Sequence, residues 1–187
     1  MRLFVAIPLP EPIKRRIYNL RDESLPVRWA KPDTYHLTLK FIGEVEDTLV
    51  EQIRDALFDV PWSEPFEIEL AQTGAFPSAE RPRVIWCGVR PQEPVITLQE
   101  KIVRVLDRFE ITGDDKSYHP HVTFGRVKKP IRAVSDFIRL NENSIIGHIN
   151  ADRFCLYSSE LKKGGAVHTV IETYTAGNEL SQPDTRH

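Results

Sequence analysis

The sequence offers little of what marks a disulfide-rich, metal-binding or membrane protein. Its 187 residues include only two cysteines, Cys87 and Cys155. Both fall in apolar runs that predict core strands, so we expect free, buried thiols rather than a disulfide or a metal site. No apolar run approaches the roughly 20 residues that span a bilayer, and the stretch Leu3–Leu9 is too short and too strand-like for a signal peptide. We therefore expect a cytoplasmic protein without a membrane partner.

Sequence patterns for metal and nucleophilic catalysis are absent as well. There is no His-Glu-x-x-His, Cys-x-x-Cys or Asp-x-Asp-x-Asp-Gly pattern, no glycine-rich phosphate loop and no Gly-x-Ser-x-Gly elbow. His119 could join His36 and His121 around zinc, but it is not well placed to be the third ligand that catalytic zinc usually needs. We expect neither a metal nor another cofactor.

The charge balance argues against a general nucleic-acid-binding surface. With 25 Lys and Arg against 27 Asp and Glu, the formal net charge is −2, which disfavours broad, non-specific binding to nucleic acid. Recognition of a single phosphate or a single RNA end stays open. The composition, 41% hydrophobic and 28% charged, is that of a soluble globular protein, and this length suits one domain or two closely packed lobes.

What the sequence does have is the pattern His-x-Thr-x twice, as His36-Leu37-Thr38-Leu39 and His121-Val122-Thr123-Phe124. Each copy lies in an apolar run that predicts a strand, in which residues i and i+2 share a face. Histidine and threonine would then point one way and the apolar residues toward a core. Two such strands side by side would combine two imidazoles and two hydroxyls, which suits in-line phosphoester chemistry with a base, an acid and donors to the phosphate oxygens.

The surroundings of the two copies indicate an internal duplication. In each half, an apolar strand, a proline-containing turn and a helical pattern precede the His-x-Thr strand, and a helix and a further strand follow it. The predicted fold class is therefore α+β, with two pseudo-symmetric β-α-β-α-β lobes whose antiparallel sheets flank a central cleft. The lobes would cover residues 1–72 and 83–176 of a single domain, terminal strands could be exchanged between them, and residues 177–187 would form a frayed tail.

The same patterns place the individual elements. Strands are predicted near 3–7, 66–71, 84–89, 144–149 and 153–158, besides the two His-x-Thr strands. Helices are predicted near 13–20, 47–58, 98–109 and 131–140, with Asp47 as an N-cap. Gly164-Gly165 predicts a hairpin turn between two late strands.

Three further polar residues lie in predicted strands. Arg126 ends the second His-x-Thr strand, but on the opposite parity from the histidine and threonine. It would reach their face only through a bulge, which Gly125 could supply, so a functional role and a surface role both stay open. His148 and His168 fall in late strands and are expected to be exposed or fully hydrogen-bonded.

Together these residues resemble the two-histidine (2H) phosphoesterases, and among them the bacterial and archaeal RNA 2′,3′-cyclic phosphodiesterases, also called 2′-5′ RNA ligases. The resemblance covers most of the chain and rests on Arg2–Ile7, Val27-Arg28-Trp29, Pro32, His36–Gly43, Phe76-Pro77, Arg81–Trp86 and Pro120–Arg126. It implies the two-lobed 2H phosphoesterase fold. It also implies metal-free hydrolysis of RNA 2′,3′-cyclic phosphate ends to 2′-phosphomonoesters, with a slow, reversible 2′-5′ joining of RNA ends.

The resemblance also implies a role for each motif residue. By position, His36 is similar to the family's proton donor to the leaving 3′-oxygen, and His121 to the proton acceptor that activates water. Thr38 and Thr123 would hold the phosphate oxygens, and Arg126 matches an arginine that contacts the phosphate. The implied partner is RNA with a 2′,3′-cyclic phosphate end, tRNA fragments among the candidates, and we expect a monomer.

Three alternatives stay open. The chain could hydrolyse cyclic phosphates on small nucleotides or ADP-ribose derivatives, or it could bind nucleotides without catalysis. It could also act mainly as a ligase, in which case the two histidines would exchange their acid and base roles.

Overall fold

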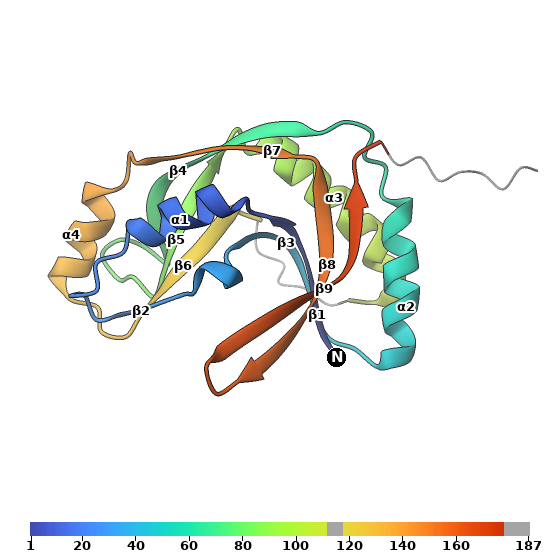
Figure 1. Cartoon of the computed structure of the whole chain (residues 1–187), viewed down its shortest axis with the longest axis horizontal. Helices are drawn as coiled ribbons and strands as arrows, with labels where there is room; N and C mark the ends of the chain where they lie inside the picture. The colour runs from blue at the N-terminus through green and yellow to red at the C-terminus, as the bar shows by residue number, and fades with distance from the viewer. Residues whose placement is uncertain (112–117, 178–187) are drawn as a thin grey trace, which may run out of the picture.

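The computed structural model describes residues 1–111 and 118–177, which form two antiparallel sheets with helices packed around them (Figure 1). The first sheet has the strand order β3-β1-β8-β9, and the second has the order β2-β6-β5-β4-β7. The predicted α+β class with antiparallel sheets is therefore confirmed. The tail expected at the C-terminus lies, from residue 178 onward, outside the described residues.

The bounds of the elements follow the chain in this order: β1 (Arg2–Pro8), α1 (Glu11–Asn19), β2 (Val27–Trp29), η1 (Pro32–Thr34), β3 (His36–Glu44), α2 (Asp47–Ala56), η2 (Leu57–Asp59), β4 (Phe66–Phe76), β5 (Val84–Arg90), α3 (Glu93–Leu106), η3 (Asp107–Phe109), β6 (His121–Val127), α4 (Arg132–Leu140), β7 (Ile145–Ala151), β8 (Arg153–Lys162) and β9 (Gly165–Thr175). Here η denotes a short 3₁₀ helix.

The two sheets do not coincide with the two halves of the chain. The first sheet joins β1 and β3 to the late strands β8 and β9, and the second joins β2 and β4 to β5, β6 and β7. Helices cross over in the same way, since α1 follows β1 but packs on β7, and α3 follows β5 but packs on β3. Because each sheet is covered by elements of the other half, the apolar core is continuous through the molecule.

The two His-x-Thr strands, β3 and β6, are in contact near the middle of the molecule (Figure 1). Their apolar side chains are almost completely buried, with Leu37, Val122 and Phe124 at 0% exposure and Leu39 at 2%. Burial of one such side chain stabilises the fold by roughly 1.5–3 kcal/mol. The apolar half of each motif therefore fixes which way the histidine and threonine point.

Several predicted boundaries differ from the structure. Helix α3 begins at Glu93, earlier than predicted, because Pro94 lies inside its first turn, where proline is tolerated, rather than in a turn before the helix. Asp47 is the first residue of α2, and Glu46 is the N-cap. Strand β4 runs through the predicted boundary between the lobes as far as Phe76. The predicted late hairpin is present, although its turn lies at 163–164.

Both cysteines are free and buried, as predicted. None of the described helices is long and apolar enough to cross a membrane.

Candidate active site

Strand alternation places the histidine and threonine of each motif on one face. Along β3, His36 and Thr38 are partly buried, and the residues between and after them are fully buried. Along β6, His121 and Thr123 alternate with buried residues in the same way. The hydroxyl of Tyr118, just before β6, donates a hydrogen bond to the Thr38 carbonyl at 2.7 Å. This bond ties the second histidine strand to the first.

A bulge in β6 brings Arg126 onto the face of Thr123 and His121. Thr123 lies opposite Trp86 and Arg126 lies opposite Val84, so β6 advances three positions where β5 advances two. Trp86 and Val84 are two residues apart and share a face of β5, and directly opposed residues share a face of the sheet. The bulge therefore resets the alternation that would otherwise turn Arg126 away.

The first motif contains the corresponding bulge. On β3, Thr38 lies opposite Ala6 and Phe41 lies opposite Phe4, again three positions against two. Phe41 consequently holds in the first motif the position that Arg126 holds in the second. Its side chain is 61% exposed, so a large aromatic ring stands uncovered on the histidine face of β3.

Three aromatic side chains pack close to His36. Its ring centroid lies 4.6 Å from that of Phe4, 6.2 Å from that of Tyr157 and 5.2 Å from that of His168. Phe4 and Tyr157 stack on each other at 5.0 Å. The histidine is therefore held in one orientation by packing, which favours catalysis that depends on accurate placement.

His121 has a matching enclosure in the second sheet. Its ring centroid lies 4.9 Å from that of Phe76, 6.2 Å from that of Trp86 and 6.2 Å from that of His119. Each motif histidine thus packs against two aromatic side chains of the Phe, Tyr or Trp type and one further histidine.

The tautomer of His121 is fixed by a backbone carbonyl. Its Nδ1 lies 2.6 Å from the carbonyl oxygen of His119, and because a carbonyl only accepts, Nδ1 carries the hydrogen. The lone pair of neutral His121 is therefore on Nε2, where it can accept a proton. The carbonyl of Thr34, also two residues upstream of its histidine, favours the protonated form of His36 in the same way.

Burial lowers the pKa of both motif histidines. For His36 the pKa falls to about 4, chiefly by desolvation, then by the charges of His168, His121 and Lys14, with the Thr34 carbonyl acting in the opposite direction. For His121, desolvation likewise lowers the pKa, and the His119 carbonyl partly opposes it. Both imidazoles are therefore mainly neutral at pH 7 in the free protein.

Comparison with known proteins shows to which family the chain that carries this site belongs. A family model described as LigT-like phosphoesterase matches residues 7–86, which include the first motif. A relative from Archaeoglobus fulgidus, named RNA 2′,3′-cyclic phosphodiesterase, is 30% identical over 177 residues, covering 93% of this chain and 99% of its own length. One of the same name from Thermus thermophilus is 32% identical over 189 residues, covering 96% and 92%. The chain belongs to the LigT-like phosphoesterase family.

Solved structures of similar proteins extend the match to the fold. The crystal structure of a Thermus thermophilus protein superimposes with a TM-score of 0.79 at 28% identity, covering 96% of this chain and 100% of that one. E. coli LigT complexed with 3′-AMP gives a TM-score of 0.77 at 25% identity, covering 94% and 97%. The LigT-like, 2H phosphoesterase fold that the family resemblance implies is therefore confirmed.

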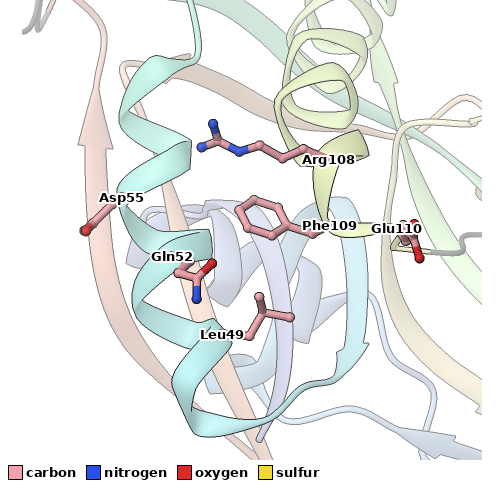
Figure 2. A pocket seen from close by; sticks show the side chains of 6 residues that line it. All are labelled: Leu49, Gln52, Asp55, Arg108, Phe109 and Glu110. Carbon is pink, nitrogen blue, oxygen red and sulfur yellow. The ribbon is translucent and has the colours of Figure 1, made fainter.

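A hollow on the surface of this LigT-like chain lies away from the motif residues. It has a volume of about 750 Å³ and lies between α2 and η3, lined by Leu49, Gln52, Asp55, Arg108, Phe109 and Glu110 (Figure 2). None of these residues belongs to β3 or β6, and its Arg108 is exposed. We therefore place the site on the histidine strands. Over residues 1–111 and 118–177, no group of three or more His, Cys, Asp or Glu could hold a metal ion.

Sequence reasoning missed two residues beside the site. His168 was expected to be exposed or fully hydrogen-bonded, but its Nδ1 is buried without a hydrogen-bond partner and its ring contacts His36. Phe41 was overlooked because simple alternation places it on the far face from His36. The same register argument that was applied to Arg126 could have found Phe41. By contrast, His148 is exposed beside Glu69, as expected.

Proposed function

We propose that this protein hydrolyses the 2′,3′-cyclic phosphate at the end of an RNA to a 2′-phosphomonoester. His36 donates a proton to the leaving 3′-oxygen, His121 accepts one from the attacking water, and Thr38, Thr123 and Arg126 bind the phosphate oxygens. One observation carries the proposal: strands β3 and β6, which belong to different sheets, are in contact, and each presents a packed, partly buried histidine beside a threonine.

The reaction balances with these groups alone. The water oxygen forms a bond to phosphorus as the bond from phosphorus to the 3′-oxygen breaks. The proton lost by water goes to Nε2 of His121, and the 3′-oxygen takes a proton from His36. Each transfer is typically worth about 10²–10⁴ in rate. Threonine hydroxyls and the Arg126 guanidinium would stabilise charge that develops on the non-bridging oxygens.

The lowered pKa of His36 fits an acid that is charged only with substrate bound. Without an anion, burial keeps this imidazole neutral, because the pKa is about 4. A bound phosphodiester brings a negative charge into the same poorly solvated space, and an opposite charge within about 4–6 Å favours the imidazolium. The proton is then in place only when there is a leaving oxygen to receive it.

Two observations favour an RNA end as the substrate. The Archaeoglobus and Thermus relatives carry the name RNA 2′,3′-cyclic phosphodiesterase. In addition, Phe41 presents an uncovered ring on the histidine face of β3. Stacking of a base on an aromatic side chain is worth about 1–3 kcal/mol and tolerates any base. A terminal nucleotide could therefore be held by its base and its phosphate together.

The experiment that tests the proposal uses an RNA oligonucleotide ending in a 2′,3′-cyclic phosphate, incubated with the protein in EDTA and followed by phosphorus NMR. A 2′-phosphomonoester product supports both the reaction and its independence of metal. An unchanged cyclic end, with tight binding of a nucleotide monophosphate, would instead favour a binding module. Turnover of 2′,3′-cyclic mononucleotides alone would favour the small-nucleotide activity.

Ligation is proposed as the same attack with a different nucleophile, so the exchange of acid and base roles expected from the sequence does not apply to the joining step. The 5′-hydroxyl of a second RNA takes the place of water and gives its proton to His121, while His36 again protonates the leaving 3′-oxygen. By microscopic reversibility, the histidines exchange these roles when the 3′-hydroxyl attacks and cleaves the 2′-5′ bond. Incubation of a cyclic-ended RNA with an RNA bearing a 5′-hydroxyl should slowly give a 2′-5′ linkage, detected by its resistance to a nuclease specific for 3′-5′ bonds.

In the cell we propose a cytoplasmic monomer that acts on RNA fragments with cyclic ends, tRNA fragments among them. Light scattering should give the mass of one 21.5 kDa chain. Sequencing of cyclic-ended RNAs from cells with and without the protein should show which fragments accumulate in its absence.

A further inference from the structure

The hairpin of β8 and β9 extends beyond the sheet to which it belongs. Strand β1 pairs with β8 only as far as Ser158, whereas β8 and β9 pair with each other out to Lys162 and Gly165. The register shifts at Leu156 and Tyr157, and such a bulge bends a strand. Figure 1 shows the turn end of the hairpin projecting from the body of the molecule. We call residues 157–170 the arm.

One face of the arm is continuous with the candidate active site. Directly opposed pairs share a face, and the pairs Tyr157 with Val170, Ser159 with His168, and Leu161 with Ala166 follow one another at two-residue steps. The two pairs farthest from the turn are Tyr157 with Val170 and Ser159 with His168. They border the site, because the rings of Tyr157 and His168 lie 6.2 and 5.2 Å from that of His36. We call this the site-side face.

The outer end of the site-side face is uncovered and apolar. Leu161 is 80% exposed and lies two residues beyond Ser159, on the same face as His168. The opposite face carries Val167, which is 43% exposed, and the ion pair between Lys162 and Glu160 at 3.2 Å. The two faces therefore differ, and only one leads to His36.

A positive charge stands beside the turn of the arm. The Nζ of Lys31 lies 3.6 Å from the position that a Cβ on Gly164 would occupy. Lys31 immediately precedes η1, which leads into β3 and His36, and β9 contacts η1. Lys163 adds an exposed ammonium at the turn itself. A chain running outward from His36 along the arm would reach these cations.

We propose that the site-side face of the arm binds the RNA nucleotide that precedes the cyclic end, with Leu161 against its ribose or base and Lys31 near its phosphate. The occupant follows from continuity, since the face begins beside His36, and from charge, since Lys31 and Lys163 lie at the turn to which that face leads. A mononucleotide has no group to place there. The inference rests on the proposed function and makes the arm a determinant of oligonucleotide preference.

The test compares a cyclic mononucleotide, 2′,3′-cyclic AMP, with a short RNA that ends in the same cyclic nucleotide. Leu161→Asp puts a negative charge on the site-side face, and we expect kcat/KM for the RNA to fall about tenfold, with 2′,3′-cyclic AMP turnover unchanged. Val167→Asp is the matched control, because it makes the same change on the opposite face of the same hairpin, and should leave both substrates unaffected. Equal thermal unfolding temperatures would show that both variants fold.

Lys31→Ala provides a second, independent readout. Loss of one phosphate contact should reduce the slope of log(kcat/KM) for the RNA against log[salt] by about 0.7 for a single strand, without changing the slope for 2′,3′-cyclic AMP.

The outcomes distinguish failure of the proposal for the arm from failure of the proposed function. If Leu161→Asp and Val167→Asp affect the RNA equally, or if neither affects it, the arm does not bind RNA, while turnover of the cyclic ends still supports the proposed function. If the wild-type protein turns over neither substrate, the proposed function fails, and the assignment of the arm fails with it.

Discussion

The imidazole of His168 meets that of His36 edge to face, with ring centroids 5.2 Å apart and ring planes at 86°. The charged groups that act on His36 come from several elements: His168 on β9, His121 on β6 and Lys14 on α1, each of which lowers its pKa. His168 is itself partly buried, which lowers its own pKa. The two rings therefore compete for protons on the acidic side of neutrality.

Replacement of His168 by phenylalanine should raise the pKa of His36. The ring and its packing are kept, and only the charge is lost, so the repulsion that opposes protonation of His36 disappears. We expect the titration midpoint of His36 to move up by about one pH unit, measured by NMR of the imidazoles. The ratio of variant to wild-type kcat/KM should stay near one at pH 8, where His168 is neutral, and rise as the pH falls through its titration. His148→Phe, at the exposed histidine of β7, should change neither quantity. An unmoved His36 midpoint in His168→Phe would mean that His168 serves packing alone.

Removal of either motif histidine should abolish turnover of a cyclic-ended RNA. His36→Ala removes the proposed acid and His121→Ala the proposed base, so each kcat should fall by about 10²–10⁴, with circular dichroism and the unfolding temperature showing that the fold survives. A single variant that retains near-normal kcat would remove that histidine from the mechanism.

The threonines should contribute less than the histidines. Thr38→Ala and Thr123→Ala each remove one hydrogen-bond donor to developing charge, for which a loss of about 10²–10³ in kcat is typical. Thr→Ser at either position keeps the hydroxyl and should recover most of the activity. Failure of serine to rescue would point to packing of the threonine methyl instead.

Arg126 should matter because the bulge turns it toward the motif face. Arg126→Ala should lower kcat/KM by about 10²–10³, and Arg126→Lys should recover part of the loss, since a lysine supplies charge without the bidentate geometry. Arg108→Ala, in the hollow of Figure 2, is the control and should leave kcat/KM unchanged. Steady-state kinetics on one cyclic-ended RNA measures all three, and a larger loss in Arg108→Ala would move the site to the hollow.

Gly74 should tolerate no side chain, because the indole of Trp86 lies across it. A Cβ at Gly74 would lie 2.2 Å from a ring carbon of Trp86, and overpacking of this kind costs about 1–3 kcal/mol. Gly74→Ala should therefore lower the free energy of unfolding, and also the activity, since Trp86 packs against His121. At Gly164 the nearest atom to an added Cβ is the flexible end of Lys31, so Gly164→Ala should keep wild-type stability in denaturant unfolding. Similar unfolding free energies for the two variants would show that the Trp86 ring can move aside at little cost.

The duplicated motif shows how far local pattern reaches. Alternation along each His-x-Thr-x run predicted which side chains would be buried, and Leu37 and Val122 are fully buried as expected. The α+β class and the family followed from the same motifs with the segments around them. The roles of His36, His121, Thr38, Thr123 and Arg126 stay predictions until the variants are measured.

The register between neighbouring strands could not be predicted from the sequence. Gly125 made a bulge plausible near Arg126, but only the partner strand decides where the extra residue falls, because a bulge is a mismatch between two strands. The same holds for Phe41, whose face changes with the shift opposite β1.

The sequence by itself determined the two strands and the inward direction of their apolar residues, and it predicted the candidate reactive groups, because these depend on periods of two and on side-chain chemistry. The tertiary structure alone decided that the sheets exchange strands between the halves, that His168 packs on His36 and that the arm continues the site. Those relationships join residues more than 100 positions apart, and they depend on which surfaces bury each other, which no local pattern records.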